Sequence, residues 1–202
     1  ADSSAGVWPT TRTDPHDDAA FMFTSGTTSH PKVVRITHEN LRANTTSIIE
    51  YLELRRTDRM LVILPFHYCF GASLLHTHLA VGGSVVLCNT FTFPETAVDL
   101  IARESCTGLA GVPSSFTLLL RASSYSTRSL RSLRLVQQAG GRLSPMAIEA
   151  LAAAQPGSRL FVMYGQTEAT ARLSYLPPER LDDKLGSIGR GLRSTRLEVL
   201  RG

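Results

Sequence analysis

Lysine is nearly absent from this chain of 202 residues, and Lys32 and Lys184 are its only examples. Arginine therefore supplies nearly all of the positive charge, and the formal net charge is a modest +4. The basic residues are scattered apart from one cluster, which consists of Arg121, Arg128, Arg131 and Arg134. Nucleic-acid surfaces usually interleave such a stripe with aromatic side chains, which this cluster lacks. We therefore predict a solvated surface there and no nucleic-acid partner.

Cysteine and long apolar runs are also scarce. The three cysteines have no CxxC spacing and cannot all pair within the chain, so we expect reduced packing residues at Cys69, Cys88 and Cys106. No run approaches the roughly 20 apolar residues that span a bilayer. The N-terminus lacks the basic-then-apolar layout of a secretory signal. These absences predict no transmembrane segment and a cytoplasmic location.

The chain does have enough hydrophobic residues, 43%, to bury a core. Residues 1–19, rich in Asp, Ser and Thr, are expected to form a linker or frayed lead-in. Beyond them, apolar runs recur about two dozen residues apart, at 60–64, 84–88, 109–112, 133–137 and 160–164. Helix-start signals lie between these runs: Thr37, Pro94 and the pair Ser144-Pro145. This alternation predicts an α/β fold with a mostly parallel sheet flanked by helices.

The segment FTSGTTSHPKVV, residues 23–34, has the chemistry of a phosphate-binding loop. Small side chains allow backbone amides to converge on an anion, and hydroxyls add donors. Lys32 adds a point charge suited to phosphate. It is not a Walker loop, because Pro31 and Val33 stand where that pattern needs glycine and a hydroxyl. The alternative is a surface turn rich in Ser, Thr and Gly.

The string TSGTTSHPK, followed by THENL, resembles the signature of the adenylate-forming superfamily. That group includes acyl-CoA synthetases, adenylation domains of peptide synthetases and firefly-type luciferases. The usual string is TSGTTGxPKGV, so Ser29 and Val33 replace two glycines, which predicts a stiffer loop. The residues that match the family and are implied to bind nucleotide are Thr24, Ser25, Gly26, Thr27, Thr28 and Lys32.

Further segments resemble the same family in the same order. PFHYCFG resembles the PxFHxxG segment, which implies an acid-side role for His67. AGVPSSF resembles the segment that lines the acyl pocket, with Gly111 and Val112. QQAGGRLSP resembles the turn along adenine, where Gly140 and Gly141 admit a flat ring because no side chain intrudes. The plain alternatives are a strand-end histidine and an ordinary strand-to-helix turn.

MYGQTEAT resembles the YGxTE motif, expected at the carboxyl end of a strand, where ligands gather in parallel sheets. By that resemblance Tyr164 stacks on adenine, Gly165 belongs to the nucleotide site, Thr167 contacts the α-phosphate and Glu168 binds Mg²⁺. An oxygen ligand suits Mg²⁺. Taken alone, Glu168 would be a surface carboxylate.

Two other arrangements near His67 involve Cys69 and a pair of histidines. Cys69 could form a nucleophilic pair with His67, but nothing nearby in the sequence supplies the group that orients such a pair. His76 and His78 could be metal ligands, but their spacing on an expected helix places them on different faces. A packing cysteine and two non-ligand histidines are the preferred interpretations.

The resemblance implies ATP-dependent activation of a carboxylic acid to an acyl-adenylate, with release of pyrophosphate and catalytic roles for Lys32, His67 and Thr167. Transfer to a thiol follows, with coenzyme A or carrier pantetheine as acceptor and an acyl carrier protein as a possible partner. ATP and Mg²⁺ are the implied cofactors. Amino-acid-activating members usually carry an aspartate within the stretch that corresponds to 67–73, and none occurs here. A fatty, aryl or other simple acid is therefore expected.

The resemblance also implies that residues 20–202 are part of an AMP-binding domain, without the N-terminal portion of the large domain and without the C-terminal lid domain. Lys184 precedes the lid segments and cannot replace their catalytic lysine, so this chain alone is expected not to turn over. The alternative function is a non-catalytic nucleotide-binding or regulatory module derived from such a ligase. Ser29 and Val33 favour that alternative, and the intact YGQTE opposes it.

Overall fold

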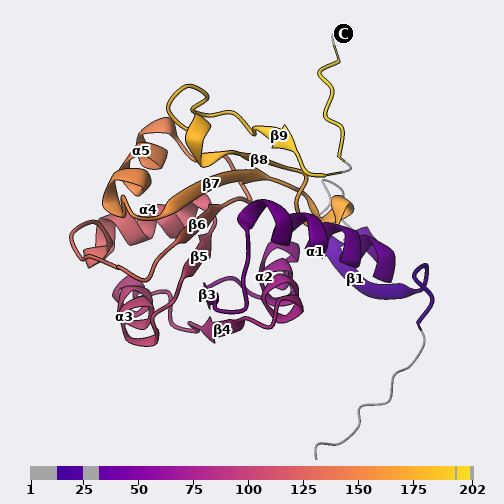
Figure 1. Ribbon diagram of the computed structural model, residues 1–202, viewed down its shortest axis with the longest axis horizontal. Helices are drawn as coiled ribbons and strands as arrows, with labels where there is room; N and C mark the ends of the chain where they lie inside the picture. Colours follow the sequence, from indigo (N-terminus) through magenta and orange to yellow (C-terminus); the bar gives the residue numbers. More distant parts are fainter. Residues whose placement is uncertain (1–12, 25–31, 194, 201–202) are drawn as a thin grey trace, which may run out of the picture.

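The computed structural model describes residues 13–24, 32–193 and 195–200. A seven-stranded sheet in the order β4-β3-β5-β6-β7-β8-β9 forms its centre, and a separate two-stranded sheet pairs β1 with β2 (Figure 1). The strands are β1 (Asp18–Thr24), β2 (Lys32–Thr37), β3 (Arg59–Val62), β4 (Ser84–Leu87), β5 (Gly108–Gly111), β6 (Leu135–Gln138), β7 (Arg159–Tyr164), β8 (Ser174–Leu176) and β9 (Arg190–Gly191).

Five strands of the large sheet, β3 to β7, are parallel, and each coincides with one of the apolar runs seen in the sequence. The mostly parallel α/β fold is thereby confirmed. β8 and β9 are antiparallel additions that the sequence did not indicate. Only a short loop joins β7 to β8, and a connection of that length can return the chain only antiparallel, because a parallel neighbour requires a long crossover.

Five α-helices connect the strands: α1 (His38–Leu52), α2 (Cys69–Ala80), α3 (Pro94–Glu104), α4 (Pro113–Ala122) and α5 (Pro145–Ala154). Three short 3-10 turns complete the described elements: η1 (Ser124–Ser126), η2 (Thr167–Ala169) and η3 (Pro178–Arg180). The expected starts are observed. Thr37 closes a capping box on α1, and the Ser144 hydroxyl accepts from the Ala147 amide at the start of α5.

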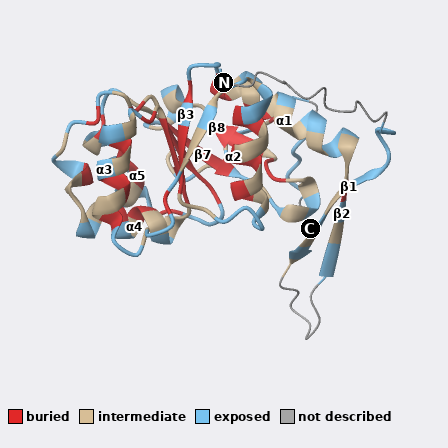
Figure 2. Cartoon of the chain, turned by 90° about the horizontal axis from the view of Figure 1, so that it is seen from below, coloured by how far each residue is buried: buried red, intermediate tan, exposed pale blue. Residues whose placement is uncertain are grey.

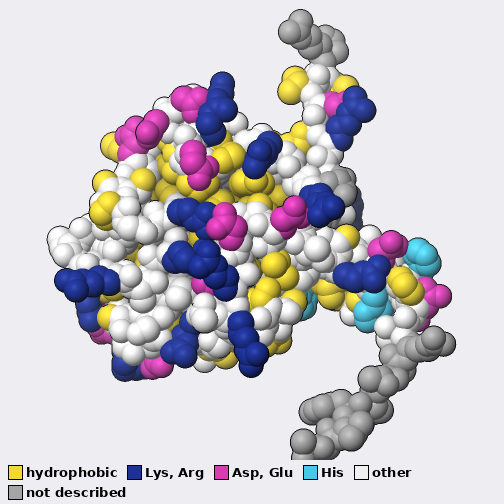
Figure 3. Space-filling model, viewed as in Figure 1, with side chains coloured by type: hydrophobic (Ala, Val, Ile, Leu, Met, Phe, Trp, Pro, Cys, Tyr) yellow, Lys and Arg dark blue, Asp and Glu magenta, His cyan; other side chains and the backbone are white. Residues whose placement is uncertain are grey.

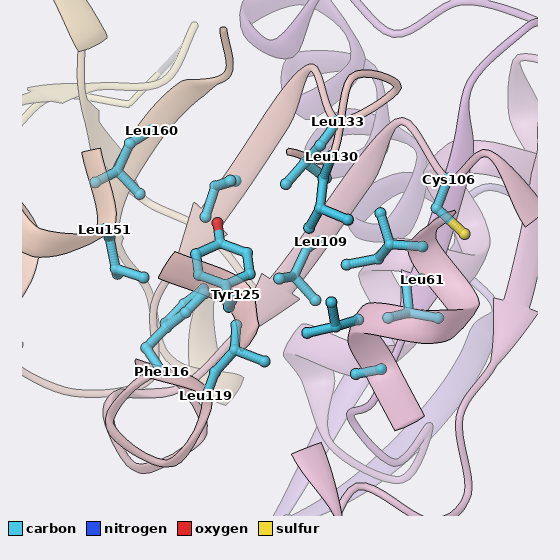
Figure 4. Packing of buried hydrophobic residues seen from close by; sticks show 14 of the residues in the cluster. Leu61, Cys106, Leu109, Phe116, Leu119, Tyr125, Leu130, Leu133, Leu151 and Leu160 are labelled. Carbon is cyan, nitrogen blue, oxygen red and sulfur yellow. The ribbon is translucent and has the colours of Figure 1, made fainter. Parts of the chain in front are cut away.

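The helices cover both faces of the sheet (Figures 1 and 2). On one face, α3, α4 and α5 pack over a core that includes Leu109, Phe116 and Leu151, with the buried Tyr125 ring among them (Figure 4). On the other face, α1 and α2 pack over a second core that includes Ile48, Phe70 and Phe161. Both faces of the inner strands β3, β5, β6 and β7 are therefore buried, which explains why these strands are mostly apolar rather than alternating.

The β1–β2 hairpin projects from the body of the molecule (Figure 2). Its register pairs Thr24 with Lys32 at the distal end. β1 begins at Asp18, so the strand includes the last two residues of the segment predicted as a lead-in. Phe21 and Phe23 are 59% and 71% exposed on it. The hairpin holds Thr24 and Lys32 at the two ends of the predicted phosphate loop.

The basic cluster is less solvated than predicted. Arg134 is ion-paired with the buried Asp58, with Nη2 and Oδ2 2.5 Å apart, and Arg128 pairs with Asp99 on α3. Only Arg121 and Arg131 lie exposed as expected. Figure 3 shows Lys and Arg side chains dispersed over one face, several of them beside acidic ones. Each of the two corrected arginines faces a carboxylate from another element, which the sequence cannot reveal.

Burial pushes the pKa of Asp58 upward, but hydrogen bonds from Arg134, the Arg55 amide and Thr107 outweigh it and hold that pKa below its ordinary value. We expect Asp58→Asn to lower the free energy of unfolding by about 2–3 kcal/mol, less than for a fully buried pair because Arg134 is partly exposed. Because the folded pKa is depressed, this stability is present above the unfolded pKa, about 3.9, and is lost as pH falls through the folded pKa.

Urea unfolding at neutral and acidic pH tests this expectation, and the gap between the two proteins should narrow below about pH 4. Asp183→Asn is the control, because Asp183 pairs with Arg180 on an open surface where both side chains are 53% exposed. It should change stability very little. Equal losses of unfolding free energy in both variants would show that the Asp58–Arg134 pair contributes no more to stability than an exposed ion pair.

All three cysteines are free thiols, and Cys88 and Cys106 are buried as predicted. Burial raises the pKa of the Cys106 thiol to about 11. Over the described ranges, no helix combines the length and apolar character that crossing a membrane requires.

Candidate functional site

Parallel strands bring their carboxyl ends to one edge of the sheet, and the predicted site residues follow those ends. Gly111 is the last residue of β5, and Val112 is the N-cap of α4. Gly140 and Gly141 follow β6 by two and three residues, and Tyr164 ends β7. The topology therefore gathers the predicted nucleotide and acid residues at one edge, where ligands bind in open α/β sheets.

A glycine is required at position 140 both by the backbone conformation there and by the side chain that lies next to it. Its φ is +79°, a region that residues with a Cβ rarely adopt. A Cβ placed there would also lie 2.9 Å from Cγ1 of Val112 on the neighbouring strand end. The β6–β7 register ends with the pair Gln138 and Val162, so the Gly140 turn and Tyr164 both lie just beyond the same pair. A bare backbone turn beside a 41% exposed tyrosine ring can accept a flat heterocycle.

The turn after β7 is packed too tightly for any side chain at Gly165. A Cβ there would lie 1.8 Å from the Ala171 carbonyl oxygen. This contact folds residues 165–171 back against the start of β8 and presents Thr167 and Glu168 on the short turn η2. Glu168 is exposed, so its carboxylate is available to a ligand.

Thr167 lies against the first residue of α2. Its hydroxyl donates to Sγ of Cys69 at 3.5 Å, and His67 stands two residues before Cys69 in the turn after β3. Thiol sulfur is a weak acceptor, so the hydroxyl can turn to a stronger one without loss. The link joins the predicted acid side to the predicted α-phosphate side of the site. Cys69 itself is only partly buried, unlike Cys88 and Cys106.

A cavity of about 520 Å³ opens between this site and the hairpin. His67, Cys69 and Phe66 line one side, and Phe21 and Phe23 of β1 line another. The volume falls within the range of small-molecule sites, roughly 300–1,000 Å³. His67 therefore borders a space large enough for an organic acid.

A second cavity, of about 560 Å³, holds Glu168 together with Arg35, Asn40, Asn44 and other residues of β2 and α1. Thr170 lines both cavities. The two spaces therefore meet at the YGQTEAT segment, between the body and the hairpin that carries Lys32.

Thr24 and Lys32 are the described ends of the predicted phosphate loop, and Lys32 is exposed. Ser25, Gly26, Thr27 and Thr28 lie outside the described residues. β2 packs against η2, so the base of the loop and the Thr167–Glu168 turn belong to one assembly.

The arrangement matches a known family over nearly its whole length. The sequence model of the AMP-binding enzyme family matches residues 2–201. The chain belongs to the AMP-binding enzyme family. The resemblance to adenylate-forming ligases seen in the phosphate loop, in the glycine turn and in YGQTE is thereby confirmed.

Curated relatives and solved structures are similar to this chain in the same way. A 2-succinylbenzoate–CoA ligase of Bacillus pumilus is 32% identical over 189 residues, covering 94% of this chain and 38% of the relative. The mitochondrial medium-chain acyl-CoA ligase ACSF2 of Rattus norvegicus is 28% identical over 92% of this chain and 31% of its own length. The o-succinylbenzoate–CoA synthetase MenE of Bacillus subtilis, solved with ATP and magnesium, superposes with a TM-score of 0.82 at 29% identity over 93% of this chain and 38% of that one.

The chain therefore spans about a third of the length of the curated relatives it matches. The chain contains the sheet edge with the glycine turn, the YGQTE turn, and the two strands that flank the predicted phosphate loop.

The residues present fit a magnesium ion held mainly by its substrate. No group of three or more His, Cys, Asp or Glu gathers as a metal cluster in the part of the chain that the structure describes. Mg²⁺ is usually bound through one or two carboxylates, phosphates and retained waters rather than by a protein cage. Glu168 supplies one exposed carboxylate beside the predicted phosphate side.

The two predicted non-ligand histidines have separate surroundings. Nδ1 of the buried His78 lies 2.8 Å from the Leu74 carbonyl oxygen, whereas His76 lines the cavity beside His67. Burial lowers the pKa of both imidazoles. The two rings face different environments, as the helical spacing predicted.

Two residues near the site had not been singled out from the sequence. Thr170 has a φ of +70° and a ψ of −36°, a strained conformation for a residue with a branched side chain. Arg172 is only 2% exposed, although it carries a charge. Arg172 had one signal in the sequence: it is the single charged residue in the apolar stretch 171–176.

Proposed function

We propose that the protein to which this chain belongs activates a carboxylic acid with ATP to form an acyl-adenylate and pyrophosphate, and then passes the acyl group to a thiol, with coenzyme A or carrier pantetheine as the acceptor. Membership of the AMP-binding enzyme family supports the first half-reaction. The names of the CoA ligases among its relatives support coenzyme A as the acceptor.

The observation that carries the proposal is convergence. His67, the Gly140–Gly141 turn, and the pair Tyr164 and Thr167 come from three separate strand ends, those of β3, β6 and β7, and meet at one edge of the sheet, facing the hairpin of Lys32. Close packing alone explains each glycine separately. It does not explain why the polar residues gather at the same edge of the sheet.

Each residue then has a role that its position allows. The bare Gly140–Gly141 backbone and the Tyr164 ring hold adenine between adjacent strand ends. Thr167 donates its hydroxyl to an α-phosphate oxygen, a charged acceptor stronger than the Cys69 sulfur it contacts here. Lys32 draws charge from the departing phosphates, and His67 orients the acid. Magnesium, when bound at Glu168, would add charge neutralisation; the protein's share is positioning and electrostatics.

Acid-dependent ATP–pyrophosphate exchange by the full-length protein tests the proposal. Exchange that appears only when an acid is added would support it. A protein that binds ATP but gives no exchange across a broad panel of carboxylic acids would instead be the non-catalytic module, and the proposal would fail.

Glu168→Gln tests the metal role directly. We expect the Mg²⁺ concentration at half-maximal exchange to rise roughly tenfold to a hundredfold, because the variant loses a charged oxygen ligand while keeping its shape. Titrating Mg²⁺ at fixed ATP measures this shift. Glu149→Gln on the exposed face of α5 is the matched control. An unaltered Mg²⁺ midpoint in Glu168→Gln would remove Glu168 from the metal site.

A further inference from the structure

A buried cation without a counter-charge lies directly beneath the acid side of the site. Arg172 is 2% exposed, and none of the ion pairs found among the described residues includes it. Nη1 donates to the Tyr51 hydroxyl at 2.9 Å, and Nη2 lies 3.4 Å from the Ser73 hydroxyl. The guanidinium stacks over the Phe70 ring at 5.0 Å. These partners are neutral, and a buried charge is costly unless it is paired.

Tyr51 cannot serve as the missing anion. Burial raises the pKa of its hydroxyl even with the guanidinium beside it, so the group stays protonated at neutral pH. The hydroxyl lies 2.9 Å from the Met163 sulfur, another neutral group. Among the described residues the positive charge is therefore left unbalanced, and none of them gives the Nε of Arg172 a hydrogen-bond partner.

A second unsatisfied side chain lies in the same layer. Gln137 is fully buried on β6, and neither its amide nitrogen nor its amide oxygen has a partner in the part of the chain that the structure describes. In the parallel register it pairs with Ala110 and Phe161, both of the core beneath α1 and α2, so its side chain points to that face. Arg172 reaches the same layer through Tyr51 and Phe70. Two unsatisfied polar side chains in one layer are unusual, because buried polar groups are nearly always hydrogen-bonded.

This layer adjoins the cavity that His67 borders. Ser73, which touches the guanidinium, also lines that cavity, and so does Ala171, the neighbour of Arg172 in the chain. A ligand that enters beside His67 therefore meets the Ser73 hydroxyl and, behind it, the guanidinium. The guanidinium is therefore separated from the cavity by the Ser73 hydroxyl, 3.4 Å from Nη2.

We propose that Arg172 and Gln137 form the far end of the acid site and select a dicarboxylic acid. One carboxylate lies at His67 and Thr167 for activation, and the second pairs with the Arg172 guanidinium while the Gln137 amide donates to it. This inference rests on the proposed function and narrows it, since an alkyl acid would leave both groups unsatisfied. A carboxylate matches the planar donors of arginine.

The test is ATP–pyrophosphate exchange by the full-length protein with straight-chain acids of matched length, such as adipate and hexanoate. The wild-type protein should prefer the dicarboxylate. Arg172→Met keeps an unbranched apolar stem and removes the charge, and it should lower kcat/KM for the dicarboxylate roughly tenfold to a hundredfold while changing the monocarboxylate only a few-fold. Arg103→Met is the control, because Arg103 is 69% exposed and pairs only with its neighbour Glu104.

The outcomes separate the two proposals. Exchange that favours monocarboxylates, or an equal loss for both acids in Arg172→Met, would overturn the dicarboxylate site and leave the activation reaction standing. No exchange with any acid would overturn the proposed function itself. If Arg172→Met does not fold, Gln137→Leu should produce the same selective loss, and the preference of the wild-type protein remains decisive in any case.

Discussion

Lys32→Ala is expected to lower acid-dependent ATP–pyrophosphate exchange roughly a hundredfold. Lys32 begins β2, is exposed and pairs with Thr24 across the base of the predicted phosphate loop. Its ammonium is a compact charge suited to the phosphates that leave as pyrophosphate. The effect should fall mainly on the rate, because charge on the departing group develops as the bond breaks.

The chain provides its own control, since Lys184 is the only other lysine. Lys184 is exposed beyond η3, away from the strand ends of the site. Lys184→Ala removes an identical charge and should leave exchange unchanged. Measurement at two ionic strengths would separate a direct contact from a general loss of positive charge, because screening weakens long-range attraction far more than a direct contact. Equal effects of the two substitutions would remove Lys32 from the site.

Gly165→Ala is expected to lower the free energy of unfolding by about 2–3 kcal/mol and to abolish nucleotide binding. The added methyl would lie 1.8 Å from the Ala171 carbonyl oxygen and 2.8 Å from the Arg172 Cα, so the turn must open. Opening it moves Tyr164 and Thr167 together, because both flank the same glycine. Denaturant unfolding and the binding of a fluorescent ATP analogue measure the two losses.

Gly157→Ala is the matched control. A Cβ at Gly157 meets no atom within 4 Å, and its φ lies outside the positive region. We expect a change in stability within about 0.5 kcal/mol and unaltered nucleotide binding. If Gly165→Ala behaves like Gly157→Ala, the close packing of the YGQTE turn is not what positions Tyr164 and Thr167.

The hydrophobic pattern predicted much of the fold because it reports local periodicity. The run at 160–164 becomes β7, and Ser144-Pro145 begins α5 as its cap chemistry requires. β8 escaped prediction because Ser174–Leu176 is too short for its pattern to differ from a loop. Its antiparallel direction follows from the tight turn at Gly165, which is a contact with Ala171 rather than a feature of composition.

In the functional site, too, local motifs could be recognised from the sequence, whereas contacts between distant segments could not. The motifs identified Gly140, Tyr164 and Thr167 from their own neighbours in the chain, since each has a local reason to be there. The contact between Thr167 and Cys69, which joins residues 98 positions apart, depends on β3 and β7 ending at the same edge. Arg134 was expected on a solvated surface, but it forms an ion pair with the buried carboxylate of Asp58. Asp58 comes from a turn that is distant in the sequence, so the pair could not be predicted.

By itself, the sequence determined the family, the alternation of the five parallel strands with helices, and the residues of the nucleotide motifs, because short spacings and small side chains carry that information. Only the tertiary structure decided which of them meet, that the two strands flanking the phosphate loop form a separate hairpin, and that Arg172 is buried with no counter-charge among the described residues. The physical reason is that burial and charge pairing depend on neighbours from other elements. The role of a charged residue in an apolar run can be inferred only when those neighbours are known.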